Sequence, residues 1–336
     1  MKVVVLTTSY PRNERDAAGR FVAEAVHGVR ERGVDVTVVS PSDFFDFGLA
    51  FGDGIAQNLR RSPWKLGLVP GFLAAYARAA RGAAHGADLV HAHWIPSALP
   101  ALATGRPYVL QVWGTDVELA RRVQPAVRPL LRRARLVIAA SSFLAGEADA
   151  LGARNVRVIP FGVETVPSAR EPDDPPHVLF AGRLSEEKGI LEFLEATEGL
   201  PRVIVGDGPL RARVPEAVGF VPPAELGAFY EHAAVFCSPS RREGYGLAAR
   251  EAMARGRPVV VTRTGGLLDL RGDGVVAVDP RDTAALRAAI ERLLGDPAER
   301  ARRSAAAAAT AAAEFSLPAA SEELVAAYRA ALDSGL

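Results

Sequence analysis

The chain has 336 residues, of which 49% are hydrophobic and 24% are charged, and its formal net charge is +1. This length exceeds what one compact core usually holds, so we expect two domains. No apolar run reaches the roughly 18 residues that a membrane span needs. The N-terminal residues turn polar by Thr7, as in a first strand and not in a signal peptide. We therefore expect a globular cytoplasmic protein that does not span a membrane.

The single cysteine, Cys237, excludes an internal disulfide framework and a cysteine-rich metal site. Its apolar flanks predict a buried strand. No dense basic face with interleaved aromatic residues is apparent, which excludes nucleic-acid binding. One cluster, from Arg121 to Arg135, carries six arginines and no acidic residue. It is either a solvated helix face or a surface for an anionic acceptor or for peripheral contact with a membrane.

Apolar runs alternate with helix-length segments along the whole chain. Fully apolar strands between helices are typical of parallel sheets that are covered on both faces. The predicted fold class is therefore α/β, with two doubly wound, Rossmann-like domains. The strands are predicted at 2–8, 34–40, 88–94, 107–113, 135–141 and 156–160, and again at 177–183, 202–208, 234–240, 257–262 and 275–279.

Prolines and acidic residues interrupt both periodicities between the two sets of strands. We therefore predict an N-terminal domain at 1–163, a linker at 164–176 and a C-terminal domain at 177–316. A terminal helix at 317–336 can pack on either domain, the N-terminal one included. The segment 41–70 is rich in aromatic residues and glycines and has little periodicity, so we expect a loop that binds the acceptor.

Ligands of such sheets bind beyond the carboxyl ends of the strands. The loop after the first strand lacks both the G-x-G-x-x-G and the G-K-[ST] fingerprints. In this loop, Gly19 is either a position where a ligand approaches the backbone closely or an ordinary glycine at a helix start. "GRLSEEKGI" at 182–190 offers Arg183 and Lys188, a forked donor and a point charge that suit a diphosphate. "VGDGP", which contains Gly206, resembles half of a dinucleotide motif.

The stretch "RREGYGLAARE" at 241–251 lies between a predicted strand and a predicted helix. Gly244 and Gly246 let a phosphate approach the helix N-terminus, where the helix dipole favours negative charge. A carboxylate beside a phosphate repels it, so Glu243 and Glu251 are expected to accept hydrogen bonds from sugar hydroxyls. A nucleotide sugar offers diphosphate and hydroxyls together, and we predict such a ligand.

These motifs resemble those of the retaining glycosyltransferases of family four, whose two-domain fold is called GT-B. The family's glutamate pair, with seven residues between, is matched by Glu243 and Glu251. "GRLSEEKG" is similar to its diphosphate-binding segment, and "GFVPPAELGAFYEHAAVFCSPS" to the stretch that meets the nucleobase. The resemblance covers nearly the whole chain. It implies two domains facing a cleft and metal-independent, cofactor-free transfer from a UDP- or GDP-sugar to a saccharide, lipid-linked or small-molecule hydroxyl acceptor.

The resemblance also implies roles for individual residues. Arg183 and Lys188 neutralise the leaving diphosphate, Glu251 binds the ribose hydroxyls, and Glu243 positions the transferred sugar. Gly19 supplies an N–H group to the diphosphate from the other domain. The remaining donor contacts are expected from Gly206, Phe220 and Val221, and from Gly244, Tyr245, Gly246 and Leu247.

The chain departs from the family where many members carry His-Gly-x-Asp, because it reads "WGTD". Trp113 takes the place of the histidine and either stacks on a sugar or fills the wall of the cleft. Asp116 is a candidate contact to the acceptor or the sugar. His91 and His93 alternate on a strand and share one face. No third metal ligand is evident, so His93 either lines the acceptor side or is a structural histidine.

Two alternatives to the transferase stay open. The chain can be a nucleotide-sugar-binding homologue without catalysis, or a nucleotide-sugar epimerase of the same fold. Epimerases lack this glutamate spacing, and the dinucleotide fingerprint of a dehydrogenase is missing from both domains. The sequence names neither the sugar, nor the base, nor the acceptor.

Overall fold

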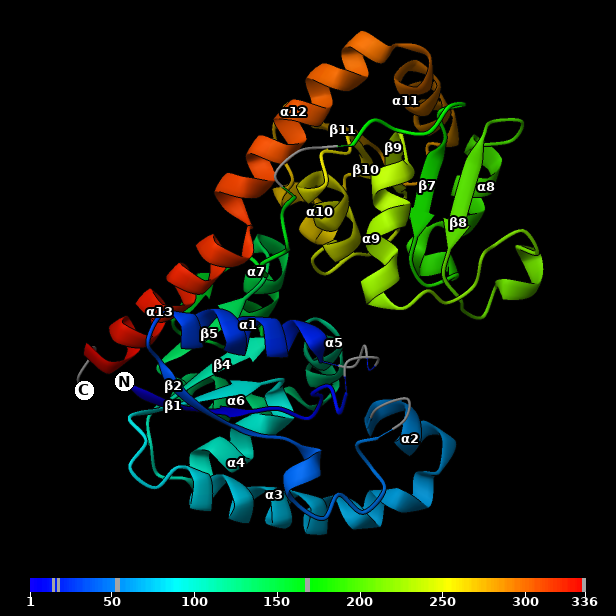
Figure 1. Cartoon of the computed structure of the whole chain (residues 1–336). Coiled ribbons are helices and arrows are strands. Elements are labelled where there is room, and N and C mark those ends of the chain that lie inside the picture. Colours follow the sequence, from blue (N-terminus) through cyan, green and yellow to red (C-terminus); the bar gives the residue numbers. More distant parts are fainter. Residues whose placement is uncertain (14–15, 17–18, 52–54, 167–169, 334–336) are drawn as a thin grey trace. The chain divides into compact units, whose positions relative to one another are not determined.

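A computed structural model describes residues 1–13, 16, 19–51, 55–166 and 170–333. The chain divides into two compact units (Figure 1). Unit 1 comprises Met1–Pro160 and Ala320–Leu336, and unit 2 comprises Phe161–Ala319. Each unit holds one parallel sheet, so the predicted fold class is confirmed. Within the described residues, no helix is both long and apolar enough to cross a membrane.

The sheet of unit 1 has six parallel strands in the order β2-β1-β3-β4-β5-β6. Its central strands are buried apart from Lys2 at the start of β1, because valine-rich runs such as that around Val4 are covered from both sides. Each strand lies within a run predicted from the sequence. The strands are β1 (Lys2–Leu6), β2 (Asp35–Val39), β3 (Leu89–His93), β4 (Tyr108–Val112), β5 (Leu136–Ala139) and β6 (Val156–Val158).

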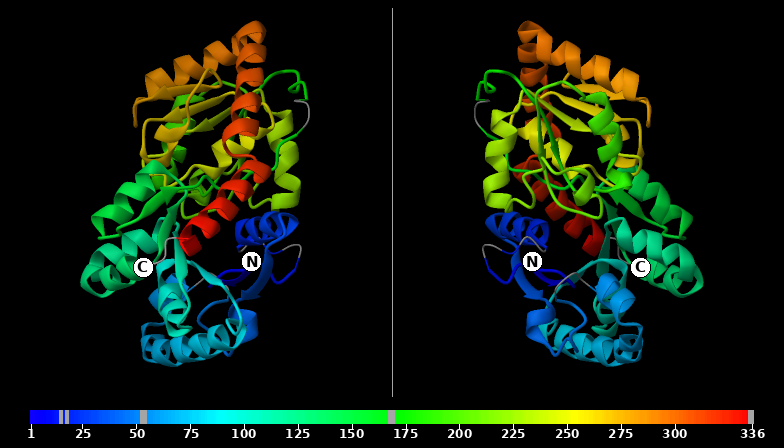
Figure 2. Two further views of the ribbon diagram at one scale, coloured as in Figure 1. Left: turned by 90° about the vertical axis from the view of Figure 1, so that its left-hand side faces the viewer. Right: turned by 90° about the vertical axis from the view of Figure 1, so that its right-hand side faces the viewer.

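Helices cover both faces of this sheet (Figures 1 and 2). The last helix packs into the same core as the first, and a side chain at Gly28 would meet Ser321 Oγ at 2.0 Å, so glycine lets the two helices approach. The helices are α1 (Arg20–Glu31), α3 (Val69–Ala83), α4 (Ala98–Ala103), α5 (Thr115–Ala120), α6 (Gln124–Arg133), α7 (Ser142–Ala150) and α13 (Leu317–Asp333), with 3-10 turns η3 (Ile95–Ser97) and η4 (Arg121–Val123).

The segment 41–70 is not the aperiodic loop that we expected. It contains η1 (Pro41–Asp43), α2 (Ile55–Arg61) and η2 (Pro63–Leu68). Prolines stand at the start of both 3-10 turns, and a capping box between Ser40 and Asp43 caps the N-terminus of the first. These elements are too short for an apolar period to show in the sequence.

The sheet of unit 2 has five parallel strands in the order β11-β10-β9-β7-β8. Cys237 lies on its central strand and is fully buried, as predicted. All five strands fall within predicted runs. They are β7 (Val178–Ala181), β8 (Arg202–Val205), β9 (Val235–Ser238), β10 (Val259–Thr262) and β11 (Val275–Val278).

Two core clusters lie on the two faces of this second sheet. One joins α9, α10 and α12 to the sheet, and the other joins α8 and α11 to it. The segments that enter and leave the unit also pair, since Val163 N donates to Phe315 O at 2.9 Å. The helices are α8 (Ile190–Ala196), α9 (Pro223–His232), α10 (Leu247–Ala254), α11 (Thr283–Gly295) and α12 (Pro297–Glu314), with 3-10 turns η5 (Glu186–Lys188), η6 (Arg211–Arg213) and η7 (Gly265–Asp269).

Candidate active site

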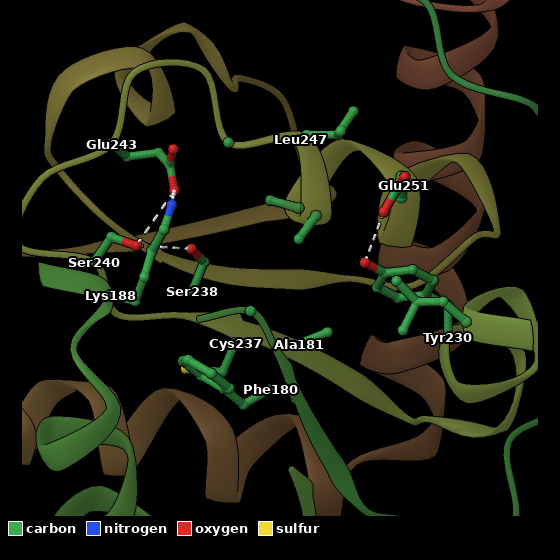
Figure 3. Close-up of a pocket in the computed structure, with 15 residues that line it drawn as sticks. Phe180, Ala181, Lys188, Tyr230, Cys237, Ser238, Ser240, Glu243, Leu247 and Glu251 are labelled. Atoms are coloured by element: carbon green, nitrogen blue, oxygen red, sulfur yellow. Dashed lines mark hydrogen bonds and ion pairs between the residues drawn. The ribbon is translucent and has the colours of Figure 1, made fainter. Parts of the chain in front are cut away.

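A cavity of about 280 Å³ opens at the carboxyl ends of β7 and β9 in unit 2 (Figure 3). This is the edge at which parallel sheets bind their ligands. Side chains from two strands, one 3-10 turn and two helices line it. The polar and charged ones are Lys188, Tyr230, Ser238, Ser240, Glu243 and Glu251.

Lys188 and Glu243 meet at one end of the cavity. Lys188 Nζ lies 2.6 Å from Glu243 Oε2, and Ser240 Oγ lies 3.5 Å from the same oxygen. Lys188 ends the turn η5 after β7, and Glu243 lies in the loop after β9, so two neighbouring strand ends bring them together. The lysine side chain is 32% exposed, which leaves it accessible to a ligand.

The N-terminus of α10 forms the middle of the cavity wall. Gly246 is its N-cap, with φ 83° and ψ 48°, and no side chain of the described residues caps it. The N–H groups of the first helical turn have no acceptor within the helix. Leu247, Ala248 and Ala249 belong to this turn and line the cavity. The cavity therefore presents backbone donors and the positive end of a helix dipole, a combination that suits an anion.

The glycine pair after β10 holds this loop in place. Gly266 N donates to Glu243 O at 2.9 Å. A Cβ atom at Gly265 would lie 1.9 Å from the same oxygen, and at Gly266 it would lie 2.3 Å from Gly244 O. Only glycines allow the two backbones to approach so closely. Gly265 and Gly266 thus support the loop that carries Glu243.

Glu251 and Tyr230 lie at the other end of the cavity (Figure 3). Tyr230 Oη donates a hydrogen bond of 2.8 Å to Glu251 Oε2. Burial raises the pKa of Tyr230 well above its ordinary value, and the Glu251 carboxylate raises it further, so the hydroxyl keeps its proton and donates. The bond fixes the orientation of the Glu251 carboxylate.

Six predicted donor residues of unit 2 do not line this cavity, and two of them, Gly244 and Tyr245, lie in the loop just before α10. Arg183 follows β7 and is exposed. Gly206 lies after β8, where its N–H group donates to Gly219 O at 2.9 Å and a Cβ atom would meet Gly182 O at 1.9 Å. Its glycine identity is therefore required by backbone packing. Beyond it, Phe220 is 66% exposed and Val221 is half-buried.

Gly19 in unit 1 begins α1. Its φ is 70°, and a Cβ atom would lie 2.2 Å from Ser9 O. The position thus requires glycine because the backbone turns there against the loop after β1. This packing requirement exists without any ligand.

Asp116 is buried in unit 1, and Trp113 near it is half-buried. Asp116 is 8% exposed and accepts hydrogen bonds of 3.0 Å from the N–H groups of Ile95, Trp113 and Gly114. Burial raises its pKa, and these bonds oppose the rise. The Trp113 ring packs 4.4 Å from that of Phe21, centroid to centroid. Asp116 thus fixes the two loops after β3 and β4, and Trp113 belongs to an aromatic cluster.

His91 and His93 share one face of β3, as predicted, with ring centroids 4.2 Å apart. Both are 1% exposed, and His91 Nδ1 lies 2.7 Å from Tyr328 Oη of α13. Burial lowers the pKa of His91 to about 3 and that of His93 well below its ordinary value. No group of three potential metal-binding side chains occurs in the described part of the chain. The buried position favours a structural role for this pair.

Sequence reasoning missed Tyr230, which lines the cavity, and Arg250, which lies next to Glu251 without lining it. Tyr230 orients Glu251 from 21 positions away, and no local pattern indicates that pair. Arg250 is a buried arginine on α10. The sequence could have indicated it, because a charged residue four positions after Gly246 shares a helix face with the apolar Met253.

Comparison with known proteins places this geometry in a family. The model described as "Glycosyltransferase Family 4" matches residues 18–166, and that described as "Glycosyl transferases group 1" matches residues 164–310. The Bacillus subtilis protein named as the teichuronic acid biosynthesis glycosyltransferase TuaC is 28% identical, over 87% of this chain and 89% of its own. The glycogen synthase of Mycobacterium tuberculosis is 31% identical, over 66% of this chain and 63% of its own.

Solved structures share the fold. Sucrose-phosphate synthase from Thermosynechococcus elongatus has a TM-score of 0.82 at 22% identity, over 99% of this chain and 100% of its own. HepE of Anabaena, crystallised with UDP-glucose, has a TM-score of 0.71 at 19% identity, over 98% and 99% of the two chains. The two Rossmann-like units and these neighbours define the fold as GT-B, and the two matching models describe glycosyltransferases. Together the two family matches cover nearly all of the sequence, and the chain belongs to glycosyltransferase family 4.

Proposed function

We propose that the protein is a retaining, metal-independent glycosyltransferase that moves a sugar from a UDP- or GDP-sugar to a hydroxyl acceptor. One observation carries the proposal. A single cavity has the Lys188–Glu243 pair at one end, Glu251 held by Tyr230 at the other, and the N-terminus of α10 between them. A nucleotide sugar presents sugar hydroxyls, diphosphate and ribose in that order.

The donor's charge explains the arrangement of the cavity. As the sugar–oxygen bond breaks, negative charge develops on the diphosphate. Lys188 and the first-turn N–H groups of α10 stabilise this charge, because they are held in place before the reaction begins. Arg183 adds a second cation from the loop after β7. Donor binding draws Lys188 toward phosphate and leaves Glu243 to accept hydrogen bonds from the sugar hydroxyls.

Retention follows from attack on one face of the sugar. The acceptor oxygen bonds to the anomeric carbon from the side on which the diphosphate leaves. The bond to the phosphate oxygen breaks, and that oxygen takes the acceptor's proton. Glu243 positions the sugar and forms no covalent intermediate. Further contacts to the donor come from the loops of unit 2 that carry Gly206, Phe220 and Val221.

The comparisons support a choice of substrates. HepE was crystallised with UDP-glucose, which favours a UDP-sugar for testing. TuaC is named for the synthesis of a polysaccharide, which favours a saccharide or lipid-linked saccharide as acceptor. We place the enzyme in the cytoplasm, with the arginine cluster Arg121–Arg135 docking an anionic acceptor or the membrane that carries it.

A thermal-shift screen against UDP-, GDP-, ADP- and TDP-sugars tests the donor, because a bound ligand raises the melting temperature. The donor that gives the largest shift is then used for turnover, with and without a metal chelator. Glu243→Gln should abolish transfer, while Glu216→Gln, at an exposed pair with Arg202, should not.

The outcomes separate the candidate functions. Binding without turnover across many acceptors supports an inactive homologue. Conversion of the donor sugar in the absence of an acceptor supports an epimerase. Full activity of Glu243→Gln contradicts the assignment of the site.

A further inference from the structure

Arg250 is a buried charge that the proposed reaction does not use. It is 3% exposed and does not line the cavity, although it precedes Glu251 on α10. Its guanidinium carbon lies 3.8 Å from the centroid of the Tyr245 ring and 5.6 Å from that of Phe315. Burying a guanidinium is costly, and an apolar side chain of the same length would fill this space without that cost. The charge at this position therefore calls for a specific reason.

The guanidinium binds two backbone carbonyls. One terminal nitrogen donates to Tyr245 O, and the other donates to Gly266 O at 3.4 Å. Arg250 thus ties the Glu243–Leu247 loop to the glycine pair on which that loop rests. The hydroxyl of Tyr245 donates in turn to Phe161 O. Tyr245 is therefore held at its backbone and at the tip of its side chain.

The hydrogen bond from Arg250 to the carbonyl of Tyr245 determines where the N–H group of Gly246 points. In a trans peptide the C=O of one residue and the N–H of the next point in opposite directions. The one cis peptide in the described part of the chain is Asp174–Pro175, so the bond from Tyr245 to Gly246 is trans. With the carbonyl of Tyr245 held by Arg250 behind the wall, the N–H of Gly246 faces the other way. Gly246 lines the cavity, whereas Arg250 and Tyr245 do not.

Gly246 needs such a restraint. Its φ of 83° lies in the left-handed region, where glycine has freedom that other residues lack. Released from Arg250, this peptide can rotate and aim a carbonyl oxygen at the ligand in place of a donor. A carbonyl there repels the phosphate that the rest of the helix N-terminus attracts.

We propose that Arg250 is a positioning residue that fixes the Gly246 N–H toward the diphosphate of the donor. Its buried positive charge adds to the potential at the same place. The inference rests on the proposed function, because it assumes that a nucleoside diphosphate binds in this cavity. It assigns Arg250 to the phosphates and not to the nucleoside.

The test compares two ligands by titration calorimetry. One is the nucleoside diphosphate whose sugar gives the largest thermal shift, and the other is its nucleoside, measured by competition if it binds weakly. Arg250→Met removes the charge and keeps the length of the side chain. Arg257→Met is the matched control, because Arg257 is 2% exposed and also binds backbone carbonyls, those of Ala233 and Arg255, at 3.0 and 3.2 Å.

We expect Arg250→Met to weaken the diphosphate about tenfold to a hundredfold, the range of one lost hydrogen bond to a charged group. Nucleoside affinity should stay unchanged. Arg250→Lys keeps a cation that cannot hold both carbonyls, and it should give a smaller selective loss, which tests the idea if the methionine variant does not fold. Arg257→Met should leave the ratio of the two affinities intact.

Three results would overturn the inference. They are equal weakening of both ligands by the Arg250 variants, no weakening of either, and the same selective loss in Arg257→Met. If the wild-type protein binds no nucleoside diphosphate, the proposed function fails and this inference falls with it. Tight wild-type binding with unaltered Arg250 variants overturns the inference alone.

Discussion

The histidine pair of β3 makes unit 1 sensitive to acid. In the folded chain His91 and His93 are neutral, because burial lowers the pKa of His91 to about 3 and that of His93 well below its ordinary value. In the unfolded chain both regain a pKa of about 6.5. The unfolded state therefore binds more protons as the pH falls below about 6.5, and stability is lost toward the folded pKa. Above neutral pH the histidines are unprotonated in both states, so they no longer lower the free energy of unfolding.

The size of the effect follows from linkage. Between pH 7 and pH 5, one histidine that is neutral when folded and titrates at 6.5 when unfolded costs about 2 kcal/mol. The pair costs about 4 kcal/mol, a large share of the total of roughly 5 to 15 kcal/mol for a typical domain. Acidic residues also contribute to acid unfolding, so the informative quantity is a difference between variants.

Urea unfolding of the wild type, His91→Gln, His93→Gln and the double variant at pH 7, 6 and 5 measures that difference. Each single variant should lose about 2 kcal/mol less than the wild type between pH 7 and 5, even if it is less stable at pH 7. His85→Gln, at an exposed histidine after α3, is the control and should follow the wild-type curve. Parallel curves for the wild type and the double variant would refute the reasoning.

Three further predictions concern the cavity of unit 2. Gly265→Ala should lower the free energy of unfolding by about 2 to 4 kcal/mol in urea, because its φ is 49° and the new Cβ meets Glu243 O at 1.9 Å. Tyr230→Phe should raise the donor KM about threefold to tenfold in steady-state assays with little change in kcat, because Glu251 loses its orienting hydrogen bond. Lys188→Met should lower kcat about a hundredfold, because the leaving diphosphate loses a cation.

Each of these has its own control. Gly199→Ala places an alanine at a φ of 75° with no atom within 4 Å, so it isolates the conformational cost, and an equal loss there contradicts the contact argument. A fall in kcat for Tyr230→Phe with an unchanged KM contradicts its orienting role. Arg287→Met removes a cation paired with Glu291 on α11, and a loss as large as that of Lys188→Met would reduce the lysine effect to overall charge.

The strands were predictable because their sequences meet one simple condition. A strand buried on both faces needs a largely apolar run, and the eleven strands of the described residues lie within runs predicted on that ground, although β2 and β6 are only partly buried. The segment 41–70 could not be predicted in the same way. Its short turns depend on the Ser40–Asp43 capping box and on prolines at first helical positions, which fix a few residues without any period.

The buried polar contacts could not be predicted from the sequence for a different reason. Tyr230 and Glu251, or Arg250 and Gly266, meet because strand order brings distant loops together, and no local pattern encodes that order. His93 shows a further limit of sequence reasoning. Its alternation with His91 predicted a shared face correctly, but alternation alone does not say whether that face is open to a ligand or, as here, buried.

The spacing of Glu243 and Glu251 has a physical meaning that the structure makes explicit. Glu243 precedes the helix in a loop that the glycine pair holds, whereas Glu251 lies on the helix itself, four residues after Leu247. Each residue of a helix turns the side chain by about 100°, so one residue more or fewer between Leu247 and Glu251 would point Glu251 away from the cavity and from Tyr230. The same rotation sets Arg250 on the buried side, behind the loop that Glu243 begins. Because α10 starts at a fixed point, it directs the Glu251 carboxylate to one end of the cavity. It also directs the buried Arg250 guanidinium to the backbone of the loop that forms the middle of the cavity wall.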